Sequence, residues 1–122
     1  ERISKEPLGP VVRSGDDDWL TLVRWVLFAL IAAEEHGITR DNVRAIRETT
    51  KHPALRRALG LDGGLSQELG TDPEWALRAV ETVGNYGEIF ERNLGAHSPL
   101  HLERGPNRPW TQGGLMYAPP LR

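Results

Sequence analysis

The stretch WLTLVRWVLFALIAA, residues 19–33, decides the fold of this chain, because only Thr21 and Arg24 interrupt an otherwise apolar run. Three aspartates precede the run, and Asp18 or Asp17 is the expected cap of a helix with acidic residues at its positive end. Gly37 closes the run, as is typical of a helix end. We therefore predict a helix over Asp17 to His36. Its apolar part is shorter than the ~20 residues that a membrane span requires. We expect a core helix covered on most of its sides, with no insertion into a membrane.

The composition is that of one globular domain, with 122 residues of which 39% are hydrophobic and 26% are charged. The 15 basic and 17 acidic residues are interspersed, so no basic stripe follows a phosphate backbone and nucleic acid is not expected as a partner. No cysteine is present, which excludes disulfides and thiolate metal sites. Because the chain begins at Glu1 without a methionine or a signal-type segment, we expect a fragment of a longer protein.

A second long helix is predicted over Pro73 to Asn93. Thr71 and Glu74 have the spacing of a capping box at its start. Gly84 and Gly87 would each cost about 1 kcal/mol relative to alanine inside a helix, so they predict a kink or a close approach of another backbone. The apolar face of this helix is predicted to contain Ala76, Val80, Val83, Gly87 and Phe90.

The other segments are expected to be short, and residues 1–122 are expected to form a single unit. A crossover strand is predicted over residues 1–15, and its extended part is expected at Leu8 to Arg13. The helical region is 16–94, with short helices at 40–48 and 53–59, and residues 95–122 form an ordered tail rich in Gly and Pro. We expect the tail to be anchored by Trp110, Leu115, Met116 and Tyr117. The predicted fold class is mainly α with one or two short strands.

No motif in the sequence supports catalysis. Glu34, Glu35 and His36 lack the HExxH spacing of a metal site, so a solvated helix end is the better interpretation. Serine-nucleophile, dinucleotide and phosphate-loop motifs are missing, and no enzyme activity or cofactor is expected. Arg24 could find a buried ion-pair partner, but we favour a side chain that reaches the solvent.

Three stretches together resemble a known family. They are ISKEPLGPVVRSGDDDWLTLVRWVLFALIAAEEHGIT (3–39), GNYGEIFERNLG (84–95) and LERGPNRPWTQGGLMYAPPLR (102–122). They resemble the carboxy-terminal part of the periplasmic general L-amino-acid binding proteins of ABC transporters, in solute-binding protein family 3. The resemblance implies a type II periplasmic binding protein fold, α/β in the parent, with residues 3–13 as the returning crossing and residues 19–36 as a helix on the first lobe.

The resemblance also implies a function, namely amino-acid transport in the periplasm by a parent protein that binds L-amino acids and passes them to a membrane permease. The family's ligand contacts, an arginine for the carboxylate and an aspartate for the amino group, fall before Glu1, so no ligand-binding residue is assigned here. The alternative is a stand-alone helical interaction or oligomerisation domain without ligand-binding activity. Unpaired strand edges and uncovered apolar surface favour self-association, with Trp19, Leu22 and Trp25 as the candidate association surface.

Overall fold

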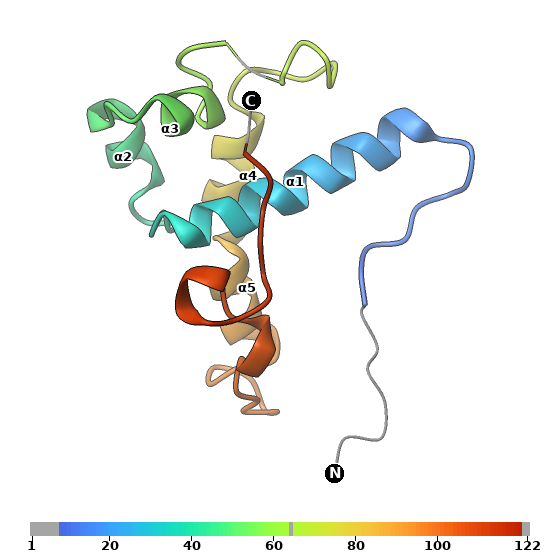
Figure 1. The fold of residues 1–122 in the computed structure, drawn as a ribbon, viewed down its shortest axis with the longest axis vertical. Helices are drawn as coiled ribbons and strands as arrows, with labels where there is room; N and C mark the ends of the chain where they lie inside the picture. Colours follow the sequence, from blue (N-terminus) through green and yellow to red (C-terminus); the bar gives the residue numbers. More distant parts are fainter. Residues whose placement is uncertain (1–7, 64, 121–122) are drawn as a thin grey trace.

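The computed structural model describes residues 8–63 and 65–120, and this part of the chain is built from helices (Figure 1). The α-helices are α1 (Asp17–Glu35), α2 (Val43–Thr49), α3 (Pro53–Ala58), α4 (Trp75–Val83) and α5 (Tyr86–Asn93); two short 3-10 helices follow, η1 (Gly105–Asn107) and η2 (Trp110–Gln112). The prediction of a mainly helical chain is confirmed. None of the helices in the described ranges combines the length and apolarity needed to cross a membrane.

The expected strand is not formed in its described part. Leu8 and Val11 are 92% and 94% exposed, and residues 1–7 lie outside the described ranges. Residues 8–63 and 65–120 provide no neighbouring strand with which the segment could pair, and Pro10 has no amide hydrogen to donate. Among the described residues, β pairing is limited to an isolated bridge between Pro109 and Met116.

Helix α1 agrees with its prediction within one residue at its carboxy-terminal end. The carboxylate of Asp16, rather than of the expected Asp17 or Asp18, accepts a hydrogen bond from the Trp19 N–H at 3.0 Å. Gly37 follows the helix with a positive φ of 65°, which glycine adopts without steric cost. Arg24 is exposed, as predicted.

The core lies at the carboxy-terminal half of α1, where this helix packs against α4 and α5 (Figure 1). Its buried residues are Leu30, Ala33, Ile38, Val43, Leu59, Leu77 and Val80. Leu77 is fully buried although it was absent from the predicted face, whereas Val83, which was predicted on that face, is 37% exposed. No residue of α1 before Ala29 is buried. The expectation that α1 is covered on most of its sides is therefore wrong for its amino-terminal half.

The predicted second long helix is divided into α4 and α5, because the chain breaks at Gly84 and Asn85. Gly84 has a φ of +81°, and Asn85 caps α5. The Asn85 side chain accepts from the Glu88 N–H at 2.9 Å, and the Glu88 carboxylate accepts from the Asn85 N–H at 2.8 Å. The buried Asn85 amide also donates to the Ile38 carbonyl at 2.8 Å, which joins the break to the end of α1. The kink predicted at Gly84 is thus a full interruption.

The start of α4 also differs from its prediction. The expected capping box of Thr71 and Glu74 does not form; instead the Asp72 carboxylate accepts from the Glu74 N–H at 2.8 Å, and the helix begins at Trp75. The two predicted short helices are present, with α3 starting at Pro53 as expected. Helix α2 begins later than expected, at Val43.

The tail after α5 folds back across α5 and α1 (Figure 1). Three of its four predicted anchors are largely exposed: Trp110 at 57%, Leu115 at 80% and Tyr117 at 58%. The tail residues that are buried are small or rigid, namely Gly95, Ser98, Pro109 and Ala118. The predicted anchoring through Trp110, Leu115 and Tyr117 is therefore wrong, and polar contacts with the end of α1 hold this segment.

Candidate functional site

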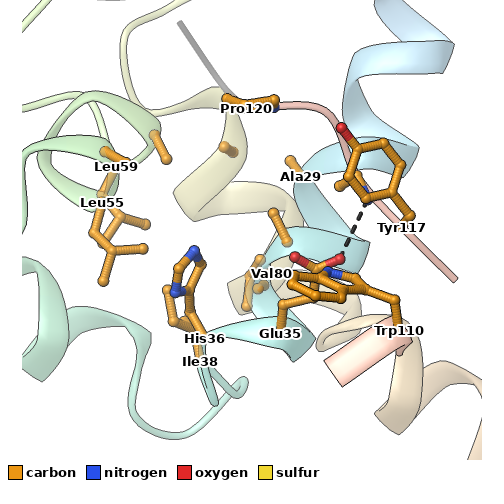
Figure 2. A pocket seen from close by; sticks show the side chains of 16 residues that line it. Ala29, Glu35, His36, Ile38, Leu55, Leu59, Val80, Trp110, Tyr117 and Pro120 are labelled. Carbon is orange, nitrogen blue, oxygen red and sulfur yellow. Dashed lines mark hydrogen bonds between the residues drawn. The ribbon is translucent and has the colours of Figure 1, made fainter. Parts of the chain in front are cut away.

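An open pocket of about 260 Å³ lies between the carboxy-terminal half of α1, α3, α4 and the tail (Figure 2). Its lining is mostly apolar and includes Ala29, Ile38, Leu55, Leu59 and Val80. Helices α1, α3 and α4 each contribute alanines to the lining, and these short side chains leave the space between the helices open. The polar groups of the lining come from Glu35, His36, Trp110 and Tyr117.

Glu35 is the acidic group of this pocket. One of its carboxylate oxygens accepts from the Ala118 N–H at 3.2 Å, the contact drawn in Figure 2. A carboxylate has about four acceptor positions, so this contact leaves most of them available. His36 is exposed and its ring lies 5.8 Å from that of His52, centroid to centroid. The pocket can therefore hold an apolar group together with one positive or hydrogen-donating group.

An ion pair beside the pocket fixes the tail to α1. The Arg104 guanidinium donates to both carboxylate oxygens of Glu34, at 2.7 and 3.0 Å, and the two side chains are 12% and 13% exposed. The guanidinium lies over the rings of Tyr86 and Phe90, at 5.5 and 5.0 Å from their centroids. The expected solvated helix end is therefore wrong for Glu34, although His36 is exposed as expected.

Gly87 makes this arrangement possible. A Cβ at this position would lie 2.6 Å from Oε1 of Glu34 and 3.0 Å from a guanidinium nitrogen of Arg104. A close neighbour is thus present at Gly87, but it is the ion pair of side chains and not the backbone that was predicted. The pairing of Glu34 with Arg104 was not predicted, because the glycine inside a helical pattern is its only trace in the sequence.

The predicted association surface lies on the uncovered half of α1. Trp19 is 52% exposed, Leu22 and Trp25 are half-buried, and the Trp25 ring contacts Phe28 edge to face at 5.7 Å. This half extends away from the other helices (Figure 1).

Among the described residues, no group of acidic or histidine side chains is arranged to hold a metal ion. No arginine or lysine lines the described pocket, so a ligand carboxylate would find no counter-ion there. An amino acid carries a carboxylate and an ammonium group, and binding it tightly requires partners for both. This pocket therefore lacks the pair of opposite charges that tight binding of a free amino acid requires.

No family model matches the chain. All 122 residues align, at 55% identity, with the glutamate/glutamine/aspartate/asparagine-binding protein BztA of Rhodobacter capsulatus. Identity is 51% with the putative amino-acid ABC transporter-binding protein YhdW of Escherichia coli and 51% with the general L-amino acid-binding periplasmic protein AapJ of Rhizobium johnstonii. The chain spans about 36% of the length of each of these curated relatives.

The fold is similar to a solved ABC transporter periplasmic binding protein from Brucella ovis with glutathione bound. The TM-score is 0.94 at 48% sequence identity, and the match covers 100% of this chain and 38% of that one. The resemblance to periplasmic amino-acid-binding proteins of ABC transporters that the sequence predicted is therefore confirmed.

Proposed function

We propose that this chain forms part of a periplasmic solute-binding protein that collects amino acids for an ABC transporter. The observation that carries the proposal is the 51–55% identity, over the whole chain, with three amino-acid-binding proteins. The structural similarity at a TM-score of 0.94 supports it. In this proposal residues 1–122 act as one unit, the carboxy-terminal part of a type II binding-protein fold, and have no catalytic role.

The proposed contribution of this chain is structural support, and ligand contact falls to other residues of the whole protein. A zwitterion is held by charge-assisted contacts to both of its ends and by exclusion of water between two lobes. The described pocket offers the Glu35 carboxylate and no arginine or lysine. We therefore expect the isolated chain to bind free amino acids no tighter than millimolar, which corresponds to about 4 kcal/mol.

In the whole protein, the amino-terminal half of α1 would pack on the first lobe. Two observations support this placement: α1 has no buried residue before Ala29, and Trp19 in this half is 52% exposed. An exposed apolar surface of this kind is typical of a region that another part of a protein covers. The lobe would cover Trp19, Leu22 and Trp25.

A second candidate is an interaction domain that uses the same surface. If nothing else covers the apolar half of α1, a second copy of the chain can do so, because apolar surface is removed from water in either case. Trp19, Leu22 and Trp25 are then the proposed association surface. The two candidates differ in what covers this surface.

A chimera tests the first candidate directly. This chain would replace the matching 122 residues of the Rhodobacter capsulatus protein, and calorimetry would compare the chimera with the unmodified protein. We expect the chimera to retain binding of glutamate, glutamine, aspartate and asparagine, because the replaced part supports the fold without contacting the ligand. A folded chimera that binds none of them would contradict the proposal.

A further inference from the structure

We propose that the pocket beside Glu35 binds a small organic cation with an apolar body, of the class of arylalkyl amines. This site is separate from the amino-terminal half of α1 and does not depend on the proposed role in amino-acid transport. Three features of the pocket support the proposal: its apolar floor, its acidic group and its aromatic rim.

The floor provides space for an apolar group. The volume of about 260 Å³ is open because alanines from three helices, among them Ala33, Ala58 and Ala76, face a space that larger side chains would fill. Leu55, Leu59 and other aliphatic side chains complete the lining. Moving an aromatic ring from water into this space is favourable in proportion to the apolar area removed from water.

The acidic group determines the charge of the ligand. Glu35 forms no ion pair within the described residues, whereas its neighbour Glu34 is already paired with Arg104. Its contact with the Ala118 N–H orients the carboxylate without neutralising it. A ligand ammonium would therefore be the counter-ion of Glu35, and a ligand carboxylate would be repelled.

The aromatic rim favours the same charge. Figure 2 shows Trp110 and Tyr117 on the same side of the pocket as Glu35. Both side chains are more than half exposed, so their ring faces are available to a ligand. Aromatic faces attract cations through their quadrupole, and tryptophan does so most strongly. Two exposed aromatic rings beside an unpaired carboxylate thus form a pattern that recognises an ammonium group on an apolar body.

Three probes with the same aromatic body separate the contributions of charge and burial. They are 2-phenylethylamine, the neutral 2-phenylethanol, and L-phenylalanine, which adds a carboxylate to the amine. Binding would be followed by NMR at about pH 8, where the amine of the probe carries its charge. The readout is the indole N–H signal of Trp110, with that of Trp19 as an internal control remote from the pocket.

We expect the amine to shift the Trp110 signal with half-saturation below about 1 mM. It should bind about tenfold more tightly than the alcohol, because a single charge-assisted hydrogen bond contributes an affinity difference of this order. Phenylalanine should bind more weakly than the amine because its carboxylate has no partner. Equal affinities for amine and alcohol would overturn the proposal, as would an unchanged Trp110 signal at about 10 mM amine.

Variants assign the site. Glu35→Gln keeps an oxygen that can accept from the Ala118 N–H but removes the charge, so it should abolish the preference for the amine and leave the alcohol unaffected. The matched control is Glu68→Gln, at an exposed acid outside the pocket, which should change neither affinity. Ala58→Leu fills the pocket and should remove binding of all three probes. If Ala58→Leu fails to fold, Glu35→Gln still decides: an unaltered amine preference would refute the proposed role of Glu35.

Discussion

Breaking the ion pair between Glu34 and Arg104 should destabilise the chain and release its tail. Both side chains are almost buried, at 13% and 12% exposure, and two hydrogen bonds join them. Removing one partner leaves the other charge without its counter-ion in a desolvated place, which costs ~3–5 kcal/mol in buried pairs. For Glu34→Ala we expect the unfolding free energy to fall by about 3 kcal/mol, at the lower end of this range. The loss is limited because Arg104 also donates to the Asn107 carbonyl and keeps that partner in the variant.

Arg104→Ala should cost more than Glu34→Ala. The guanidinium lies over Tyr86 and Phe90, and each cation–π contact adds about 0.5–1 kcal/mol. Truncation also removes the aliphatic part of the side chain from this packing. We therefore expect a loss of about 4 kcal/mol, with Arg104→Lys between this variant and the wild type because lysine keeps the charge but not the paired hydrogen bonds.

Urea denaturation followed by circular dichroism measures these losses, and a double-mutant cycle isolates the pair. The coupling energy of Glu34→Ala with Arg104→Ala should exceed about 1 kcal/mol. The matched control is the pair of Arg44 and Glu81, which also has two hydrogen bonds but lies exposed on α2 and α4. Solvent screening should make its coupling clearly smaller. Equal coupling in the two pairs would refute the argument from burial.

Three further predictions concern other parts of the chain. Gly87→Ala should lower the unfolding free energy by about 1–3 kcal/mol in the same urea assay, because its Cβ would overlap the Glu34 carboxylate; an unchanged midpoint would contradict this. The Arg44 guanidinium, mainly through its hydrogen bonds, lowers the pKa of Glu81, so the stabilisation from this pair should be present above the ordinary glutamate range and disappear as the pH falls through the lowered value. An NMR titration that places Glu81 at its ordinary pKa would rule this out. Light scattering of the isolated chain at tens of micromolar should show self-association that Trp25→Ser weakens, and a clean monomer would count against the association surface.

The elements that the sequence predicts well are those with local start and stop residues. Helix α1 is bounded by its aspartates and by Gly37, and α3 by Pro53, so their limits depend on residues a few positions apart. The second helix shows the limit of such patterns. Gly84 is compatible with a kink, a close approach or a break, and the break is decided by the Asn85 amide reaching Ile38, a partner 47 positions away in the sequence.

The candidate site depends almost entirely on distant contacts. Glu34 and Arg104 are 70 positions apart, and Glu35 meets the tail at Ala118, 83 positions away. The run of residues 19–33 is apolar along its whole length. The sequence therefore does not show that the tail and α4 cover its carboxy-terminal half and leave its amino-terminal half exposed. For the same reason the tail's large side chains were predicted to be anchors, although Trp110 and Tyr117 form the rim of a pocket.

The amino-terminal half of α1 is central to two proposals, packing on the first lobe of a whole binding protein and self-association of the isolated chain. Both proposals assign the same surface, around Trp19, Leu22 and Trp25, and one surface cannot be covered twice. The chimera with the Rhodobacter capsulatus protein should therefore be monomeric at concentrations where the isolated chain associates. Trp25→Asp should then have opposite consequences in the two settings: it should disperse the isolated chain, and it should destabilise the chimera because a charge is buried without a partner. If the chimera still associates and Trp25→Asp disperses it without loss of stability, the first lobe does not cover α1 and the surface serves a second copy instead.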